Sequence, residues 1–206
     1  MILMYHHVGP TVKGGNWVSA EKFDRDLKAI AAAGKRVVPL ARYASPAEQV
    51  VLTFDDGNRD ILEFAAPRMA GLGFPFELFL VGRRFGQGGG ERGNWLSERD
   101  VAAVRGCGGR LQYHSWTHAD LTLVADDALE AEIGPPESLA ALDPEGFEFF
   151  AYPFCRYDER ILRLVRKRYR GAVSGKGLGR ENEAYAMDRV KVTEDRMLFQ
   201  HDRKSV

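Results

Sequence analysis

The sequence has little cysteine, and the two residues that it does have show no metal-ligand spacing. Cys107 and Cys155 stand apart in a chain of 206 residues. A disulfide between them cannot be argued without their separation in space, so we expect two free thiols. The cysteines therefore indicate neither a thiolate metal site nor a disulfide framework.

The chain also lacks a charge imbalance and a long hydrophobic run. Lysine plus arginine and aspartate plus glutamate both number 29, so no broad attraction to nucleic acid or anionic membrane is implied. No stretch approaches about 18 consecutive apolar residues, and the initial MILMYHHVGP is too short for a signal peptide. We expect a soluble, cytoplasmic chain as given. The chain opens inside a predicted strand. If an upstream signal or anchor was removed from a longer precursor, the protein would instead be exported or envelope-associated.

Short apolar runs alternate with helical patterns along the whole chain. With 45% hydrophobic residues, the chain can bury one substantial core, and we treat residues 1–206 as a single domain. Eight runs are predicted to be short buried strands: Ile2–Tyr5, Arg36–Leu40, Val50–Phe54, Phe74–Val81, Arg110–Tyr113, Phe147–Tyr152, Gly171–Ser174 and Met187–Val192.

Helical periodicity fills the intervals between these runs. The clearest helix begins after Ser19, a residue suited to the N-cap, and ends at Gly34. The alternation predicts an α/β fold with a mainly parallel sheet, closed or nearly closed into a barrel, in which functional groups gather at the carboxyl ends of strands. Four further helices are predicted: Arg59–Ala70, Ser97–Arg105, Asp126–Ile133 and Asp158–Tyr169.

Two adjacent carboxylates, Asp55 and Asp56, follow the predicted strand Val50–Phe54 and precede Gly57. Placing two anions where a buried strand ends is costly unless a cation binds one of them or their pKa values are pushed apart. Asp-Asp-Gly alone is equally consistent with an ordinary turn. The pair therefore indicates a cation site only with support from elsewhere.

His114 and His118 supply that support, because they lie four residues apart directly after the predicted strand Arg110–Tyr113. In a helical turn this spacing puts both imidazoles on one face, and neutral imidazole is a preferred ligand of zinc. An isolated pair of this spacing is usually incidental. Two imidazoles and one carboxylate leave a coordination position open for water, the hydrolytic pattern, and a second carboxylate can act as base toward that water.

The motifs TFDDG and HSWTH resemble the first two motifs of the polysaccharide deacetylases, the NodB-homology domain of carbohydrate esterase family four. The resemblance covers nearly the full chain, since LMYHHV, FDRDLKAIAAAGKRVVPL, FPFELFLVG, WLS and YPFCRYD stand in the matching order. It implies a distorted (β/α)7-type barrel and hydrolytic removal of acetyl groups from an N-acetylated carbohydrate.

Carried over by position, the resemblance implies that Asp55 is the general base and that Asp56, His114 and His118 hold one divalent ion. The expected ion is zinc, with cobalt, nickel or manganese as alternatives. Tyr152-Pro153-Phe154 resembles the third motif, whose backbone N–H after the proline helps to stabilise the oxyanion, here the N–H of Phe154. An ordinary strand-end turn is the alternative interpretation of this segment.

Two positions depart from the family pattern. Many members carry an arginine in the third motif that orients the base, and a glycine after its aromatic residue, whereas this chain has Ala151 and Cys155 there. Arg156 and Arg189 are candidates for the arginine, although we favour a surface or structural ion pair for each. Cys155 is expected to be a small buried thiol rather than a metal ligand.

The catalytic histidine that the family usually places near its carboxyl end has a poor counterpart in His201, which lies near a charged end of the chain. The first predicted strand ends in His6 instead and resembles the subgroup in which this strand is circularly permuted to the amino terminus. We therefore expect His6 to be the general acid, with His201 as the second choice. His7 alternates to the opposite side of the strand and is expected to be structural.

Two other functions stay open at this point. The same metal site could hydrolyse a small amide or cyclic imide, or the chain could be a catalytically inactive carbohydrate-binding domain. An exposed Trp17, Trp95 or Trp116 lining a groove would favour a glycan, whereas a closed pocket would favour a small molecule. The expected partner is an N-acetylated glycan or oligosaccharide, with no nucleic acid and no membrane span.

Overall fold

The structure, a computed structural model, describes residues 1–87, 94–175 and 183–199. Its strands are β1 (Ile2–Tyr5), β2 (His7–Gly9), β3 (Trp17–Ser19), β4 (Arg36–Val37), β5 (Gln49–Phe54), β6 (Phe76–Leu80), β7 (Gly109–Tyr113), β8 (Phe149–Ala151), β9 (Gly171–Val173) and β10 (Arg189–Lys191). The main sheet has the order β10-β1-β5-β6-β7-β8-β9 with β4 beside β5, while β2 and β3 pair separately. Every pairing in both sheets is parallel.

The two ends of the main sheet come back together. Val173 in β9 pairs with Met187, two residues before β10. The Ser174 N–H donates to the Met187 carbonyl at 2.8 Å, and the Met187 N–H donates to the Ala172 carbonyl at 3.0 Å. The seven strands from β10 to β9 therefore form a nearly closed barrel, with β4 as an eighth strand outside this path, and the predicted α/β barrel is confirmed.

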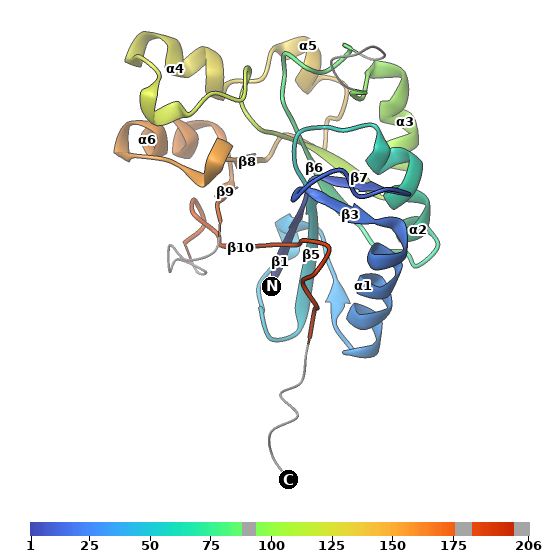
Figure 1. The fold of residues 1–206 in the computed structure, drawn as a ribbon. Helices are drawn as coiled ribbons and strands as arrows, with labels where there is room; N and C mark the ends of the chain where they lie inside the picture. Colours follow the sequence, from blue (N-terminus) through green and yellow to red (C-terminus); the bar gives the residue numbers. More distant parts are fainter. Residues whose placement is uncertain (88–93, 176–182, 200–206) are drawn as a thin grey trace.

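Helices and short helical turns surround this barrel. They are α1 (Ala20–Ala32), α2 (Ala66–Ala70), α3 (Glu98–Gly106), α4 (Asp126–Ile133), α5 (Glu137–Ala140) and α6 (Glu159–Arg168), with 3-10 turns at Leu40–Arg42, Leu121–Leu123 and Pro153–Cys155 and a π turn at Ile61–Ala65. Figure 1 shows α1, α2 and α3 on one side of the strands, and α4 and α6 on the other. Within the described ranges, no helix is both long and apolar enough to cross a membrane.

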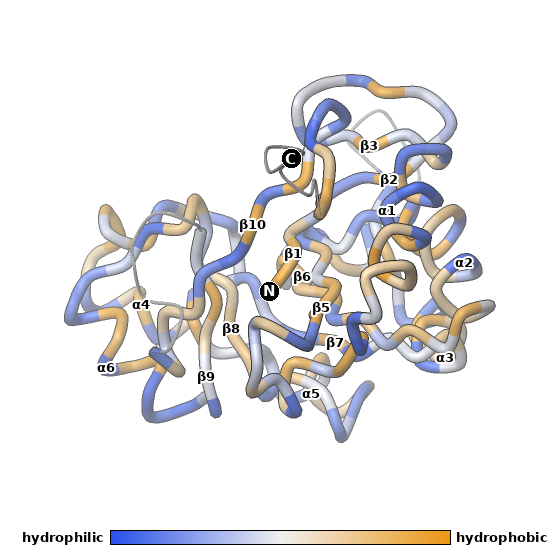
Figure 2. Tube along the Cα trace, turned by 90° about the horizontal axis from the view of Figure 1, so that it is seen from below, coloured by the Kyte–Doolittle hydropathy of each residue, from blue (hydrophilic) through white to orange (hydrophobic). Residues whose placement is uncertain are grey.

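Strands β1, β5, β6, β8 and β9 are buried along their whole length, which explains why they appear in the sequence as short continuous apolar runs. Leu3 and Tyr5 of β1 belong to a large cluster that includes α1. Ile2 of the same strand belongs to a second, smaller cluster with Val51 and Phe79. In Figure 2 the hydrophobic colour is strong along these central strands. Because every pairing in the sheet is parallel, the carboxyl ends of the strands lie together at one edge of the barrel.

Several local predictions are confirmed, among them those for the two ends of α1. The Ser19 side chain accepts a hydrogen bond from the Lys22 N–H at 3.0 Å, and Gly34 follows α1 with a left-handed φ of 63°. Both cysteines are free thiols.

The prediction of one helix over Arg59–Ala70 is wrong in detail, because a π turn precedes α2. The predicted strand Arg36–Leu40 is shorter because Pro39, which lacks an N–H, precedes a 3-10 turn.

Candidate active site

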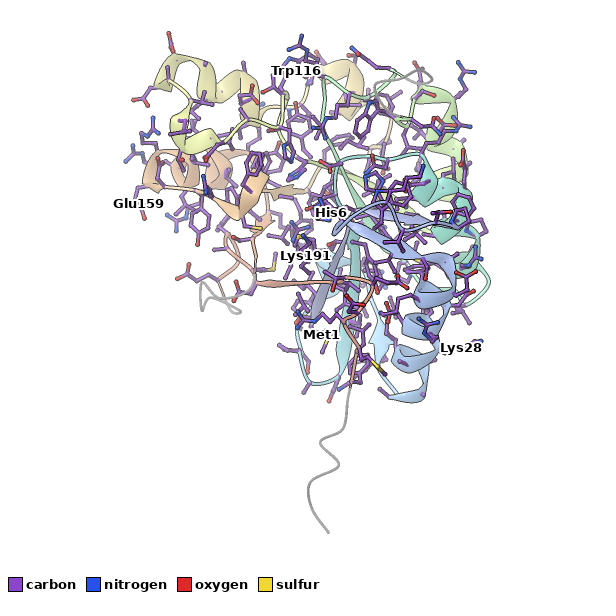
Figure 3. The ribbon with its side chains drawn as sticks, in the orientation of Figure 1. Met1, His6, Lys28, Trp116, Glu159 and Lys191 are labelled. Carbon is purple, nitrogen blue, oxygen red and sulfur yellow. The ribbon has the colours of Figure 1, made fainter. Side chains whose placement is uncertain are left out.

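The candidate residues meet at the carboxyl edge of the barrel. Tyr5 of β1 is in register with Phe54 of β5, and the Asp55 N–H donates to the Tyr5 carbonyl at 3.0 Å. His6 and Asp55 therefore leave neighbouring strands at the same level. Figure 3 shows His6 in the middle of the molecule, where β1 ends.

Asp56, His114 and His118 offer ligand atoms that all lie within 4.8 Å of one another. The His118 Nε2 and Asp56 Oδ1 atoms are 3.4 Å apart. Two ligands bound at about 2.0–2.1 Å to one tetrahedral cation lie roughly 3.3 Å apart, so this separation suits a shared ion. The Nδ1 atom of His114 lies 2.7 Å from the Ala151 carbonyl oxygen. Donation there leaves Nε2 free to bind metal, and we call these three residues the metal trio.

The loop that carries both histidines is not helical, so the predicted helical turn is wrong. Ser115 and His118 have left-handed φ values of 68° and 64°. The Ser115 hydroxyl accepts the His118 N–H at 2.9 Å, which closes the loop. Thr117 fixes the loop to α4, because its N–H and hydroxyl donate to the Glu132 carboxylate at 3.0 and 2.7 Å. A folded loop, rather than a helix face, brings His118 back to His114, with ring centroids 4.9 Å apart.

A left-handed turn separates the roles of the two adjacent carboxylates. Asp56 and Gly57 both have a φ of 76°, a conformation that costs energy for a residue with a side chain. A Cβ on Gly57 would lie 2.8 Å from the Leu80 Cδ2 atom, so a side chain at this φ would add both strain and a close contact. Asp56 therefore belongs to the metal trio, whereas Asp55, which directly follows β5, is buried.

Asp55 is held by Arg189, which lies on β10 and is fully buried. Its Nη1 and Nη2 atoms donate to the two Asp55 oxygens at 2.6 and 2.7 Å. Burial raises the pKa of Asp55, but the charges of Arg189 and His114 outweigh burial and bring the pKa far below its usual range. Our sequence interpretation of Arg189 as an ordinary surface or structural ion-pair residue is corrected: its partner is the candidate base itself.

The other candidate arginine and the cysteine lie outside the metal trio. Arg156 forms an exposed ion pair with Asp120 at 2.6 Å, as expected for a surface residue. Cys155 has a left-handed φ of 58°, which explains why glycine suits this position, and its side chain is half-buried rather than fully buried. Burial raises the pKa of the Cys155 thiol. A neutral thiol is a poor metal ligand.

Burial lowers the pKa of His6, His114 and His118, because removal from water disfavours the charged imidazolium. The nearby Asp55 and Asp56 act in the opposite direction on all three histidines. Neutral imidazole is the form that binds a cation, so burial prepares His114 and His118 for that role.

The remaining histidines are elsewhere. The Nδ1 atom of His7 lies 2.6 Å from Asp60 Oδ2, and its ring stacks on Trp17 with centroids 4.3 Å apart. These contacts agree with the expected structural role. His201, the second choice for the general acid, lies outside the described residues.

Phe154 lies at the rim of the metal trio. Its ring centroid is 4.9 Å from that of His118, and its side chain is 58% exposed. Its backbone is left-handed, with a φ of 55°. The two hydrogen bonds of this turn use the N–H groups of Cys155 and Arg156. Neither of them uses the N–H of Phe154, which was predicted to stabilise the oxyanion.

One residue of the site escaped the sequence reasoning. Arg84, in the turn after β6, donates from Nη1 to Asp56 Oδ1 at 2.9 Å. It follows Arg83 in a loop, and no spacing or periodicity distinguishes the two arginines. Only the packed structure reveals which one reaches the site.

Comparison with known proteins agrees with this fold. YxkH of Bacillus subtilis, provisionally named a polysaccharide deacetylase, is 25% identical over 93% of this chain and 71% of its own length. The Bacillus anthracis protein BA0330 has a TM-score of 0.80 at 22% identity over 95% of this chain, which spans only 65% of that protein. The Streptococcus pyogenes deacetylase PplD, solved with acetate, has a TM-score of 0.81 at 22% identity over 94% and 92% of the two chains.

The family model named "Polysaccharide deacetylase" matches residues 42–169. This range contains the Asp55-Asp56 pair, both histidines of the metal trio and Phe154, whereas His6 and Arg189 lie outside it. Since the match spans more than half of the sequence and includes a site whose three ligands converge, the chain belongs to the polysaccharide deacetylase family, the NodB-homology domain of carbohydrate esterase family four.

Proposed function

We propose that this chain is a metal-dependent hydrolase that removes acetyl groups from an N-acetylated carbohydrate of the N-acetylglucosamine type. One observation carries the proposal: the metal trio lies beside Asp55, a second carboxylate that is buried and ionised. A site that only held a structural ion would need no such neighbour. The His114 Nε2 atom is 3.9 Å from Asp55 Oδ2, so Asp55 lies next to one member of the metal trio.

Asp56, His114 and His118 would hold the divalent cation, which we propose to be zinc. When bound there, zinc supplies Lewis-acid polarisation of a carbonyl and lowers the pKa of water. Three protein ligands of this kind match the catalytic rather than the structural pattern, in which four protein ligands close the site.

Asp55 would accept a proton from the attacking water. Its two hydrogen bonds to Arg189 fix the plane of the carboxylate and keep it ionised, so no prior deprotonation is needed. The same ion pair makes Asp55 a weak base. The proton would therefore not be retained on Asp55 and would pass to the neutral imidazole of His6.

His6 would deliver a proton to the leaving nitrogen as the amine departs. Burial keeps its imidazole neutral at rest, while the charges of Asp55 and Asp56 favour the protonated form. His6 is thus suited to take up a proton during the reaction and release it in the next step. The Phe154 N–H would donate to the developing oxyanion from the rim of the site.

Trp116 supports a glycan over a small amide as the substrate. Its side chain is 37% exposed and lines an open hollow of about 250 Å³ together with Phe85 and Leu139, and none of the residues that line this hollow belongs to the metal trio. It lies in the same loop as both histidines, and aromatic faces pack well on sugar rings. The other two tryptophans are engaged, Trp17 with His7 and Trp95 with Arg84.

The test is acetate release from an acetylated chito-oligosaccharide, measured on chelator-treated protein before and after zinc or cobalt is added. We expect release only with the metal. A parallel series of small amides and cyclic imides tests the rival substrate class. Zinc-loaded protein that releases no acetate from any acetylated sugar would contradict the proposal, and it would favour the small-amide or the carbohydrate-binding alternative.

A further inference from the structure

Arg84 binds the oxygen that the metal trio presents to a cation. Its Nη1 atom donates to Asp56 Oδ1 at 2.9 Å, and this same oxygen is the one that lies 3.4 Å from His118 Nε2. A carboxylate oxygen has two lone pairs, so it can accept a hydrogen bond and bind a cation together. Arg84 therefore need not leave when the site is filled.

The surrounding structure keeps the guanidinium in place. The Arg84 Cζ atom is 4.8 Å from the ring centroid of Trp95, within the range of a cation–π contact. Trp95 in turn pairs with Asn58, two residues after Asp56, in an antiparallel bridge. The ring, the guanidinium and the carboxylate thus form one packed unit.

The charges of the site explain what this unit does. Arg189 neutralises Asp55 and Arg84 neutralises Asp56, so the two carboxylates and two guanidiniums sum to zero before a dication binds. The positive charges of Arg84 and of a bound dication repel each other. The Arg84 side chain is only 32% exposed, which limits the screening of this repulsion by solvent. A hydrogen bond to Asp56 also draws electron density from the oxygen that would bind the metal. Both effects oppose cation binding, and both leave a bound cation electron-poor.

We propose that Arg84 lowers the affinity of the metal trio for its divalent cation and thereby raises the Lewis acidity of that cation. This inference rests on the proposed metal-dependent function, and it assigns Arg84 an electrostatic effect on the cation that acts through Asp56. Its cost is weaker metal binding, and its benefit is stronger polarisation of the acetyl carbonyl.

The experiment measures the Kd for zinc by competition with a chromophoric chelator at fixed pH and ionic strength. Arg84→Met is expected to lower the Kd at least tenfold, about 1.4 kcal/mol. Arg83→Met is the matched control, because it removes the same charge from the adjacent, exposed residue. The control is expected to keep the wild-type Kd within about twofold, since its charge is more screened.

Arg84→Gln guards against misfolding of the first variant, since it loses the charge but keeps an amide donor, and it is expected to tighten zinc binding as well. An unchanged Kd in a folded Arg84 variant would overturn the proposal. A Kd raised about 10- to 100-fold would also overturn it, because that loss is typical of a residue that merely orients a metal ligand. Wild-type protein that binds no zinc would instead contradict the underlying metal-dependent function.

Discussion

Arg189 and Asp55 are 134 positions apart in the chain and form a two-pronged ion pair in the barrel interior, with hydrogen bonds of 2.6 and 2.7 Å. The Arg189 Cζ atom also lies 5.5 Å from the Phe79 ring, and its Nε donates to the Ser174 carbonyl at 3.1 Å. The residue therefore links β10 and β9 to the end of β5. Arg189 thus joins the strands that close the barrel and also keeps the candidate base ionised.

Replacing Arg189 with Met is expected to destabilise the protein by about 3–5 kcal/mol, because it leaves the Asp55 charge buried without a partner. Denaturant unfolding of the chelator-treated protein measures the effect. Arg156→Met is the matched control, since Arg156 pairs with Asp120 at the surface and is expected to contribute less than about 1 kcal/mol. Equal losses of stability in the two variants would show that the buried ion pair contributes no more than the surface ion pair.

The pH dependence of stability follows from the same pair. The folded-state pKa of Asp55 is lowered, so the contribution of the pair is complete above the unfolded value of about 3.9 and disappears as the pH falls through the folded pKa. Arg189→Met removes the largest of the interactions that lower the pKa of Asp55, so burial weighs more against the remaining influence of His114 and His6 and the pKa is expected to rise. The stability difference between wild type and variant should therefore shrink as the pH falls from neutral toward the lowered folded pKa of Asp55, as a series of unfolding curves would reveal. A stability difference that stays constant with pH would contradict this contribution of the Asp55–Arg189 pair.

Asp55→Asn separates the base from the metal trio. Because Asp55 is not one of the three converging ligands, zinc affinity is expected to change little, whereas turnover should fall by about 10²–10⁴-fold. The variant also leaves Arg189 without its anion, so activity must be assayed well below the unfolding temperature. Full activity in this variant would remove the base assignment, and loss of zinc binding would place Asp55 among the ligands.

His6→Gln tests the general acid. It is expected to retain zinc binding and to lower kcat about 10²-fold or more with a smaller effect on KM, since proton delivery occurs after substrate binding. His7→Gln is the neighbouring control, because His7 is bound to Asp60 and stacked on Trp17. If the control loses as much activity as the His6 variant, the assignment to His6 has no support.

Much of the fold could be predicted from the sequence, because most of the apolar runs correspond to strands that are buried along their whole length. The predicted Ile2–Tyr5 has the observed bounds of β1, and the predicted Asp126–Ile133 has those of α4. The short strands β2 and β3 were missed, since three-residue segments show no periodicity. The position of the metal trio followed from strand ends, which share one edge of a parallel sheet.

The parts of the site that could not be predicted depend on contacts distant in sequence. Arg189 was recognised as a candidate, but only barrel closure shows that it reaches Asp55 rather than the surface. Arg84 had no local signal, since its partner Asp56 lies on another loop. His118 was identified by its spacing from His114 for a reason that proved wrong, because left-handed residues and the Ser115 hydroxyl fold that loop.

The central claim is that one cation binds between Asp56, His114 and His118. Diffraction data collected at the zinc absorption edge from crystals of the zinc-loaded protein test it most directly. The account predicts a single strong anomalous peak about 2.0–2.2 Å from one oxygen of Asp56 and the Nε2 atom of each histidine. Zinc-loaded crystals with no peak at this point, or with zinc held by other residues, would contradict it.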